Sequence, residues 1–204
     1  MSKRLEVLES LVDTKKVFDV GCDHGILALS LSSSHDVVAS DITISSVNKT
    51  KKLKEDADAN FEVIQSDGLD KLDITPDSTL ILAGMGTYTI IKILKKDFNK
   101  VPNTLIIQAN NNHDILRGEL SKLGFYIDRE VYLYESRWYT IIRFKKGYKK
   151  YSKMQYLIGV YPSLEYLKFM LKYYTDVYNK IPYKHFYKKI KTLHIIKYVK
   201  KQLK

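Results

Sequence analysis

Three short apolar segments of this chain each end in residues that can bind a polar ligand. The first is followed by the loop Gly21-Cys-Asp-His-Gly25, the second by Asp41 and the third by Asp67-Gly68. Glycine lets the main chain approach a ligand closely and adopt positive φ. Asp41 stands 20 residues after Gly21, the spacing at which nucleotide-binding folds place a carboxylate on ribose hydroxyls. Asp67 is suited to accept from an adenine amino group, so the three positions together predict a nucleoside site.

The loop after the first segment also indicates the charge of the ligand. Folds that bind NAD or FAD hold the pyrophosphate with the spacing G-x-G-x-x-G at a helix N-terminus. Here the spacing is Gly21-x-x-x-Gly25, and Asp23 lies inside the loop. Its negative charge repels a pyrophosphate but suits a cofactor that carries an ammonium and a sulfonium. Any one of these acids is as well explained as a helix N-cap, whereas three in register favour a ligand site.

Short apolar segments alternate with helical patterns along the first part of the chain. The predicted strands are residues 17–20, 37–40, 61–65, 79–83 and 104–108. Helical patterns follow at residues 26–31, 45–58, 88–94 and 115–123. This alternation predicts a mostly parallel sheet with helices on both faces, an α/β doubly wound fold whose ligands bind beyond the carboxyl ends of the strands.

The alternation stops at residue 125. Residues 125–134 and 139–144 have the composition of two strands joined by a turn at 135–138, which predicts an antiparallel hairpin at the end of the sheet. The polar, basic segment 145–150 is the predicted linker. Domains are therefore expected at residues 1–147 and 148–204, and apolar spacing predicts two antiparallel helices in the second.

Residues 148–204 differ from the rest of the chain in charge. They hold 14 lysines and two acids, a net charge of +12, which leaves −1 of the total of +11 for residues 1–147. They also hold 11 of the 16 tyrosines. Interleaved cations and aromatic rings suit phosphate contacts and base stacking, so this segment predicts binding of RNA or another polyanion. A genome rich in A and T would explain many lysines and tyrosines, but not their uneven distribution.

The remaining composition excludes several classes of protein. A single cysteine, Cys22, excludes a disulfide framework, and the five scattered histidines form no cluster with zinc-ligand spacing. No stretch approaches the roughly 20 apolar residues that cross a bilayer, and residues 1–19 lack the apolar core of a signal peptide. We therefore expect a cytoplasmic protein without metal or membrane attachment.

Taken together, the motifs resemble those of the bacterial tRNA (adenine-22, N1)-methyltransferases. That family has a G-S-D-H loop, an A-G-M-G segment after the fourth strand and Q-P-N after the fifth. This chain reads Gly21-Cys-Asp-His24, Ala83-Gly-Met-Gly86 and Gln108-Ala-Asn110, and it begins with Ser2-Lys-Arg-Leu5 as those enzymes do. The match covers the whole sheet domain and the type of C-terminal extension, a coiled-coil-like helical arm.

The resemblance implies a Rossmann-like domain that binds S-adenosylmethionine and methylates N1 of an adenine in tRNA. N1 already has a lone pair, so no strong general base is needed, but the base must be exposed or extruded and aligned with the methyl group. The predicted catalytic residues Gln108, Asn110 and Asn111 would bind the base edge or help to remove the N6 proton through water. The residues implied to line the cofactor pocket are Gly21, Asp23, His24, Asp41, Ile42, Asp67, Gly68, Gly84 and Met85.

Two departures from the family pattern affect the substrate more than the reaction. Ala109 replaces the proline of Q-P-N, which loosens the main chain there, and Thr87 stands where the family often has a second glycine. An ordinary polar loop before a helix is the alternative explanation of the asparagine cluster. A helix-capping role is equally open for His24.

The predicted partner is tRNA, and a monomer is favoured. Candidate RNA contacts are Arg4, Arg137, Lys149 and Lys150. Trp138, expected in the hairpin turn, either stacks on a base or seals the sheet, and the second role is favoured.

Four alternatives stay open at this point. A nicotinamide-dependent oxidoreductase would share the fold, but it is disfavoured by the missing glycine motif and by Asp23. A methyltransferase of another RNA would keep the same residues. A methyltransferase of a small molecule or protein has no use for the basic, aromatic arm. A non-catalytic RNA-binding protein with a retained cofactor pocket is the fourth.

Overall fold

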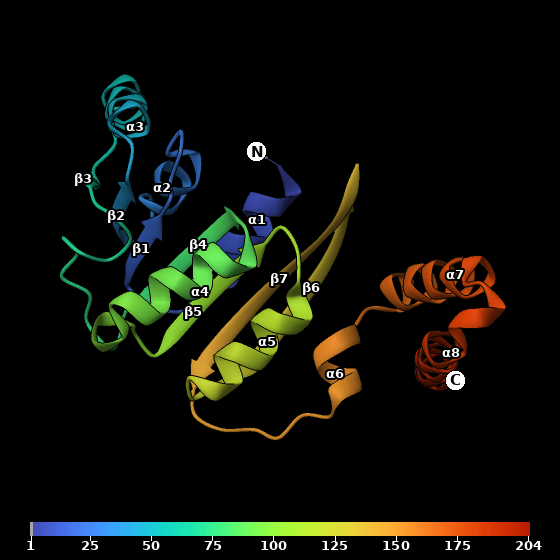
Figure 1. The fold of residues 1–204 in the computed structure, drawn as a ribbon. Coiled ribbons are helices and arrows are strands. Elements are labelled where there is room, and N and C mark those ends of the chain that lie inside the picture. Colours follow the sequence, from blue (N-terminus) through green and yellow to red (C-terminus); the bar gives the residue numbers. More distant parts are fainter. Residues whose placement is uncertain (1) are drawn as a thin grey trace.

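A single seven-stranded sheet forms the centre of the protein (Figure 1), which a computed structural model describes over residues 2–204. The strands are β1 (Lys16–Val20), β2 (Asp36–Asp41), β3 (Glu62–Gln65), β4 (Thr79–Met85), β5 (Thr104–Ala109), β6 (Phe125–Glu135) and β7 (Arg137–Lys146). The α-helices are α1 (Lys3–Ser10), α2 (Ile26–Leu31), α3 (Ile44–Asp56), α4 (Thr87–Lys96), α5 (His113–Lys122), α6 (Lys153–Ile158), α7 (Leu164–Lys180) and α8 (Phe186–Gln202). Two short 3₁₀ turns, η1 (Phe98–Lys100) and η2 (Tyr183–His185), precede β5 and α8.

The strand order is β3-β2-β1-β4-β5-β7-β6. The first five strands of this order are parallel, and β7 runs antiparallel to both β5 and β6. The chain reverses its direction of travel across the sheet between β1 and β4, and the loops on either side of such a point leave a crevice beyond the strand ends. The predicted α/β fold with a terminal antiparallel hairpin is confirmed.

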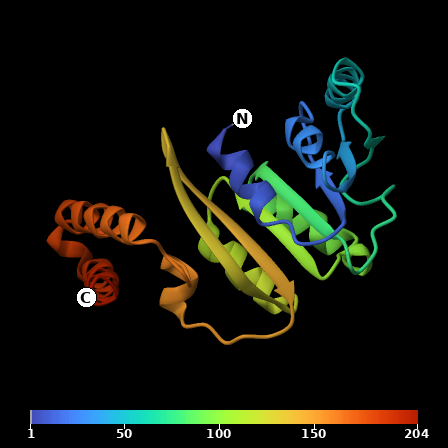
Figure 2. The same cartoon turned by 180° about the vertical axis from the view of Figure 1, so that it is seen from behind.

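Both faces of the sheet are buried, which explains the nearly continuous apolar strands. Phe18, Leu80 and Leu82 face α4 and α5 in one core cluster. Val17 and Ile81 face the other way, into a second cluster with α1 and α2. Figure 2, seen from behind, shows α1 lying across the sheet on the face opposite α4 and α5. The alternation of side chains along each strand thus builds a three-layer domain.

The hairpin is longer and more tightly turned than the sequence pattern predicts. Strands β6 and β7 meet at Ser136, which takes a positive φ of 42°. Trp138 therefore lies in β7, paired with Tyr134, and the expectation of a turn over residues 135–138 is wrong. Lys145 and Lys146 also belong to β7 rather than to a linker, because they continue the ladder opposite Tyr126 and Phe125.

Two short helices were not predicted. Helix α1 begins at Ser2, whose hydroxyl accepts from the Leu5 N–H, and its apolar side packs on the hairpin face of the sheet. Helix α6 begins with a capping box in which Ser152 and Gln155 exchange hydrogen bonds. Serine followed three residues later by glutamine is a recognised start signal for a helix, and it was present in the sequence.

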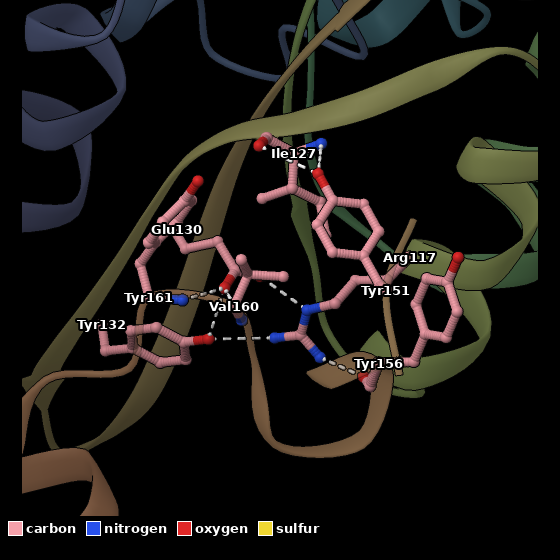
Figure 3. Close-up of polar contacts among 8 residues, drawn as sticks. All are labelled: Arg117, Ile127, Glu130, Tyr132, Tyr151, Tyr156, Val160 and Tyr161. Carbon is pink, nitrogen blue, oxygen red and sulfur yellow. Dashed lines mark hydrogen bonds and ion pairs between the residues drawn. The ribbon is translucent and has the colours of Figure 1, made fainter. Parts of the chain in front are cut away.

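A buried polar cluster attaches the segment after the hairpin to the sheet domain (Figure 3). Arg117 of α5 donates from Nε to Glu130 Oε1 at 2.6 Å and from Nη1 to the Tyr156 carbonyl at 2.8 Å. Oε2 of Glu130 accepts from the Tyr132 hydroxyl at 3.0 Å and from the main-chain N–H groups of residues 160 and 161. One carboxylate thus ties β6, α5 and the chain after α6 together; we call these residues the Glu130 cluster.

Helices α7 and α8 pack side by side and form a third apolar cluster with Ile158 and Tyr132. Trp138 lies 5.3 Å from the ring of Tyr166 and 5.6 Å from that of Phe169, so it seals the contact between β7 and α7. The division into residues 1–147 and 148–204 stays a prediction, since these contacts cross it. We call residues 148–204 the arm.

Among the residues described, no helix combines the length and apolar character needed to cross a membrane. Residues 2–204 likewise contain no group of three or more His, Cys, Asp or Glu side chains placed to hold a metal ion.

Candidate functional site

A trough lies beyond the carboxyl ends of β1, β2 and β4, where the topology leaves its crevice. One half has a volume of about 510 Å³ and the other of about 380 Å³. The two halves share Gly21, Asp41 and Met85 as lining residues, so they are parts of one site. Asp23, His24 and Gly84 line only the first half, and Ile42, Asp67 and Gly68 line only the second. All nine residues predicted to line a cofactor pocket are therefore brought together.

The loop after β1 is held mainly by its own backbone. The N–H groups of Gly21 and Cys22 both donate to the Ser40 carbonyl, at 2.8 and 3.0 Å. Gly21 adopts a φ of +80°, and a Cβ there would lie 2.1 Å from the Met85 methyl carbon. Glycine takes this positive φ without strain, and the loop here passes beside the flexible end of the Met85 side chain after β4.

Asp41 fixes two loops against each other. Its Oδ1 accepts from the N–H and the hydroxyl of Thr43, at 2.9 and 3.0 Å, and Oδ2 accepts from the Asp23 N–H at 3.3 Å. Asp23 itself is exposed and has a φ of +50°, and its carboxylate lies 3.6 Å from His24 Nε2. The first half of the trough thus carries exposed negative charge on a constrained turn.

Asp19 adds a buried carboxyl to the same half of the trough, and the sequence analysis missed it. It lies in β1, is 4% exposed, and its Oδ2 has no hydrogen-bond partner among residues 2–204. Burial, and secondarily the charge of Asp41, raise the pKa of Asp19 to about 7. A charged residue inside the apolar strand Lys16–Val20 was the signal that could have found it.

The second half of the trough is lined by both apolar and basic side chains. Ile42 is 59% exposed and Ile93 packs within 3.3 Å of the Cβ position of Gly68, whose φ is +62°. Asp67 is exposed and its carboxylate accepts from Lys96 Nζ at 2.9 Å. An apolar slot beside an exposed carboxylate suits a planar heterocycle that carries an amino group.

The predicted catalytic side chains lie beside Gly84, at the rim of the first half. Gln108 is only 1% exposed, and its Oε1 accepts from Arg4 Nη1 at 2.9 Å and from the Gly84 N–H at 3.2 Å. Its Nε2 donates to Asn110 Oδ1 at 3.2 Å. Asn110 is exposed and donates from Nδ2 to the Gly84 carbonyl at 2.7 Å. Gln108 is therefore too buried to contact a substrate and can only orient its neighbours, whereas Asn110 is exposed and can contact a substrate.

Asn111 lies in the same loop but holds α4. Its Oδ1 accepts from the Thr87 N–H at 3.3 Å, and its main-chain carbonyl accepts from the Thr87 hydroxyl. The threonine that departs from the family pattern thus fastens the loop after β5 to the start of α4. Asn112 ends this loop with a positive φ of 48°.

Two of the four predicted RNA contacts lie at this rim, both near the ring of Tyr139. The guanidinium carbons of Arg4 and Arg137 lie 5.6 and 4.8 Å from the centroid of Tyr139. Arg137 also donates to Asn110 Oδ1 at 3.4 Å. The sequence analysis did not single out Tyr139, because nothing in the strand pattern distinguishes it from neighbouring residues.

The other two, Lys149 and Lys150, lie away from the trough. They follow β7, whose last residues pair with the first residues of β5, at the opposite edge of the sheet from the trough. Lys149 Nζ rests 4.3 Å from the ring centroid of Tyr126. Any contact of these lysines with RNA is therefore separate from the chemistry at the trough.

The trough fits a cofactor that carries positive charge and a nucleoside. The unpartnered Asp19 Oδ2 is a buried acceptor that a cationic ligand can satisfy. The turn at Gly21 lines both halves of the trough with main chain, and acids at two further strand ends are available to hydroxyl and amino groups.

Comparison with known proteins gives a consistent result. Residues 1–142 match the family model described as a methyltransferase domain. A protein of Mycoplasma genitalium, provisionally named a tRNA methyltransferase, is 31% identical over 175 residues, which are 80% of this chain and 78% of the relative.

Solved structures agree over the whole chain. The crystal structure of a Streptococcus pneumoniae protein, provisionally named a tRNA (m1A22) methyltransferase, superposes with a TM-score of 0.89 at 26% identity and full coverage of both chains. The same protein in complex with S-adenosyl-L-methionine gives a TM-score of 0.86 at 25% identity, again with full coverage of both chains. The arm is thus included in the match.

Proposed function

This chain belongs to the methyltransferase domain family, and from that premise we propose that it transfers a methyl group from S-adenosylmethionine to N1 of adenine 22 in tRNA. The cofactor and the substrate are inferred from the full-length likeness to the Streptococcus pneumoniae protein and its complex.

One observation carries the proposal most strongly. The trough and the exposed amide of Asn110 meet at Gly84, which lines the trough and accepts from Asn110 Nδ2 through its carbonyl. A cofactor bound in the trough and a base bound at Asn110 are thus adjacent. Adjacent binding of donor and acceptor is the main requirement of a group transfer that needs no strong base.

The chain's own residues supply the cofactor contacts. S-Adenosylmethionine supplies a methyl group activated by a sulfonium. We assign its ammonium to Asp19 and Asp23, its ribose hydroxyls to Asp41, and its adenine to the slot between Ile42, Gly68 and Asp67. Carboxylates in the first half of the trough favour positive charge and disfavour a pyrophosphate, so this arrangement also disfavours a nicotinamide cofactor.

At the rim, Asn110 orients the base, and Gln108 and Asn111 hold the loop that carries it. N1 of adenine attacks the methyl carbon through its own lone pair while the bond from the methyl group to sulfur breaks, and S-adenosylhomocysteine leaves as the neutral thioether. The positive charge passes to the base, which can afterwards release it as an N6 proton to water. The side chains therefore have to position and desolvate the base rather than remove a proton first.

The arm is assigned to the RNA. Its net charge of +12 and its 11 tyrosines suit the phosphate backbone and unpaired bases of tRNA. Arg4 and Arg137 are placed to meet phosphates beside the reacting base, whereas Lys149 and Lys150 would meet more distant ones.

The proposal is tested by transfer of labelled methyl groups from S-adenosylmethionine to unmodified bulk tRNA, followed by nucleoside analysis. Label recovered as 1-methyladenosine is the expected result. Label in another nucleoside would move the substrate to another position on RNA. Cofactor binding without any label in tRNA would contradict the proposal and favour a small-molecule methyltransferase or a non-catalytic RNA-binding protein.

A further inference from the structure

A chain of hydrogen bonds at the rim has its direction fixed at one end by a guanidinium. Arg4 donates to Gln108 Oε1 at 2.9 Å, Gln108 Nε2 donates to Asn110 Oδ1 at 3.2 Å, and Asn110 Nδ2 donates to the Gly84 carbonyl at 2.7 Å. Arginine has five N–H donors, no acceptor, and stays charged at any physiological pH. Gln108 must therefore turn its oxygen, not its nitrogen, toward Arg4.

The surroundings of Gln108 reinforce this orientation. A second donor, the Gly84 N–H, meets the same oxygen at 3.2 Å, while the Ala109 carbonyl accepts from Nε2 at 3.0 Å. If the Gln108 amide were reversed, its NH2 group would face the two donors of Arg4 and Gly84, and its oxygen would face the Ala109 carbonyl. Gln108 is buried, so water cannot replace the lost bonds, and the reversed state is costly.

The direction passes on to Asn110. Both lone pairs of its Oδ1 are used, by Gln108 Nε2 and by Arg137 Nη2 at 3.4 Å. One of its two Nδ2 hydrogens goes to the Gly84 carbonyl. The other has no acceptor among residues 2–204, although Asn110 is exposed beside a residue that lines the trough. The one bonding position that Asn110 leaves for a substrate is therefore an N–H donor.

We propose that Arg4 is a positioning residue that makes Asn110 a hydrogen-bond donor to the adenine, and that the atom it meets is a ring nitrogen other than N1. This inference rests on the proposed function. N1 is excluded because its lone pair forms the bond to the methyl carbon. The N6 amino group is excluded because it is itself a donor. The acceptor is therefore N7 or N3, and Asn110 holds the purine ring through one of these edges.

The test uses tRNA transcripts whose target base is adenine, 7-deazaadenine or 3-deazaadenine, assayed with wild-type protein and with Arg4→Gln, Arg4→Lys and Arg129→Gln. For the wild type, one of the two deaza bases lowers kcat/KM by about tenfold, the effect of one lost hydrogen bond. Glutamine at position 4 can present either end of its amide, so in Arg4→Gln the orientation of Gln108 depends on the Gly84 N–H and the Ala109 carbonyl alone. Arg4→Gln should therefore lower the rate on adenine, by at most about tenfold. We call the factor by which a deaza base lowers kcat/KM the deaza penalty. In Arg4→Gln this penalty falls below about twofold, because the substitution and the deaza base remove the same interaction.

Two variants serve as controls. Arg4→Lys keeps a cation without an acceptor, so it keeps the direction of the chain and restores the deaza penalty. Arg129→Gln makes the same substitution at an exposed arginine of β6 and leaves both rate and penalty unchanged. Each deaza base also alters the basicity of N1, but this change is common to all four proteins and cancels in the comparison.

A measurement without substrate separates this inference from the proposed function. The side-chain amide protons of the buried Gln108, followed by NMR, should exchange slowly with water in the wild type and in Arg4→Lys, and faster in Arg4→Gln. Unchanged exchange in Arg4→Gln, or a deaza penalty that Arg4→Gln retains in full, overturns the inference. Wild-type protein that methylates both deaza substrates as fast as adenine also overturns it. Absence of methylation with slow amide exchange counts against the proposed function instead.

Discussion

The trough and the arm are held in place by opposite means. In the loop after β1, the main chain makes the holding contacts: the N–H groups of Gly21 and Cys22 bond the Ser40 carbonyl, and residues at positive φ let the loops turn back on the strand ends. The arm is attached by side chains, with one buried carboxylate, Glu130, bonded to four separate groups. The loop at the trough is therefore sensitive to any side chain added at a glycine. The attachment of the arm is sensitive to the loss of one buried polar side chain.

The two regions also differ in charge. The trough presents acids to a cationic cofactor, and the arm carries the surplus of lysines that suits a polyanion. Under the proposed function, opposite charges in one chain would keep the RNA backbone away from the cofactor acids and concentrate it on the arm and on the arginines at the rim.

The largest effect is expected from breaking the Glu130 cluster. Glu130→Gln removes the charge that faces Arg117, whose side chain is 1% exposed, and a buried charge without its partner costs about 3–5 kcal/mol. Urea unfolding measures this loss. Asp36→Asn, which breaks an exposed pair with Lys15, is the control and should cost less than about 1 kcal/mol. Equal, small losses for both variants would contradict the side-chain attachment of the arm.

The backbone basis of the trough is tested by two glycine substitutions. Gly21→Ala strains a φ of +80° and forces the flexible end of Met85 to move, so it should destabilise the protein by about 1–3 kcal/mol and weaken cofactor binding. Gly118 lies inside α5 with no atom within 4 Å of its Cβ position. Gly118→Ala should therefore stabilise by about 0.5–1 kcal/mol. Thermal unfolding measures the change in stability of each variant, and calorimetric titration measures its cofactor affinity. If Gly21→Ala changed neither quantity, the loop would not depend on glycine at this position.

The acidic character of the trough is tested at Asp19. Calorimetry should show about tenfold weaker binding of S-adenosylmethionine to Asp19→Asn, because one charged hydrogen bond is lost. Since burial raises the pKa of Asp19 to about 7, wild-type affinity should rise as the pH passes upward through that value. A pH-independent wild-type affinity, or an unchanged affinity in the variant, contradicts the assignment.

The raised pKa of Asp19 also predicts how the stability of the protein changes with pH. The folded value of about 7 lies above that of an unfolded aspartate, about 3.9. The stabilising contribution is therefore complete below about pH 4 and is lost as the pH rises toward 7. In cofactor-free protein, Asp19→Asn should be more stable than the wild type at pH 8, with the difference shrinking toward pH 4. Denaturant unfolding at several pH values measures it.

The smallest effect concerns the lysines at the base of the arm. Replacing Lys149 and Lys150 by Gln should weaken tRNA binding a few-fold and reduce the slope of log affinity against log salt by about one per lysine that meets a phosphate. The matched control replaces Lys51 and Lys52, which are exposed on α3 of the sheet domain. An identical slope change in both pairs would show that the arm holds no special place in RNA binding.

The sequence was sufficient for the trough because parallel topology brings strand ends together. Once residues 17–20, 37–40 and 61–65 are read as strands, Gly21, Asp41 and Asp67 must lie at one edge of a sheet. Asp19 was missed because a buried carboxyl within a strand leaves no spacing signal. The direction of the amide chain from Arg4 to Asn110 was also out of reach, because it joins residues more than 100 positions apart.

The arm was less accessible to sequence reasoning. Helices α7 and α8 follow from apolar spacing, but their attachment depends on Arg117 and Glu130, which look like surface residues of a helix and a strand. Trp138 was placed in a turn because the strand pattern weakens around Ser136, whereas pairing with Tyr134 extends the strand to Arg137. Long-range side-chain contacts decide such positions, and local patterns do not contain them.

The central claim, that the trough and the rim together methylate one adenine of tRNA, is tested most directly with two tRNA transcripts that differ only at position 22. Methyl transfer is measured with adenine and with guanine at that position, and the modified nucleotide is mapped. The account predicts one 1-methyladenosine per adenine-22 transcript and none in the guanine-22 transcript. Equal labelling of both transcripts, or no labelling of either by protein that binds S-adenosylmethionine, would contradict it.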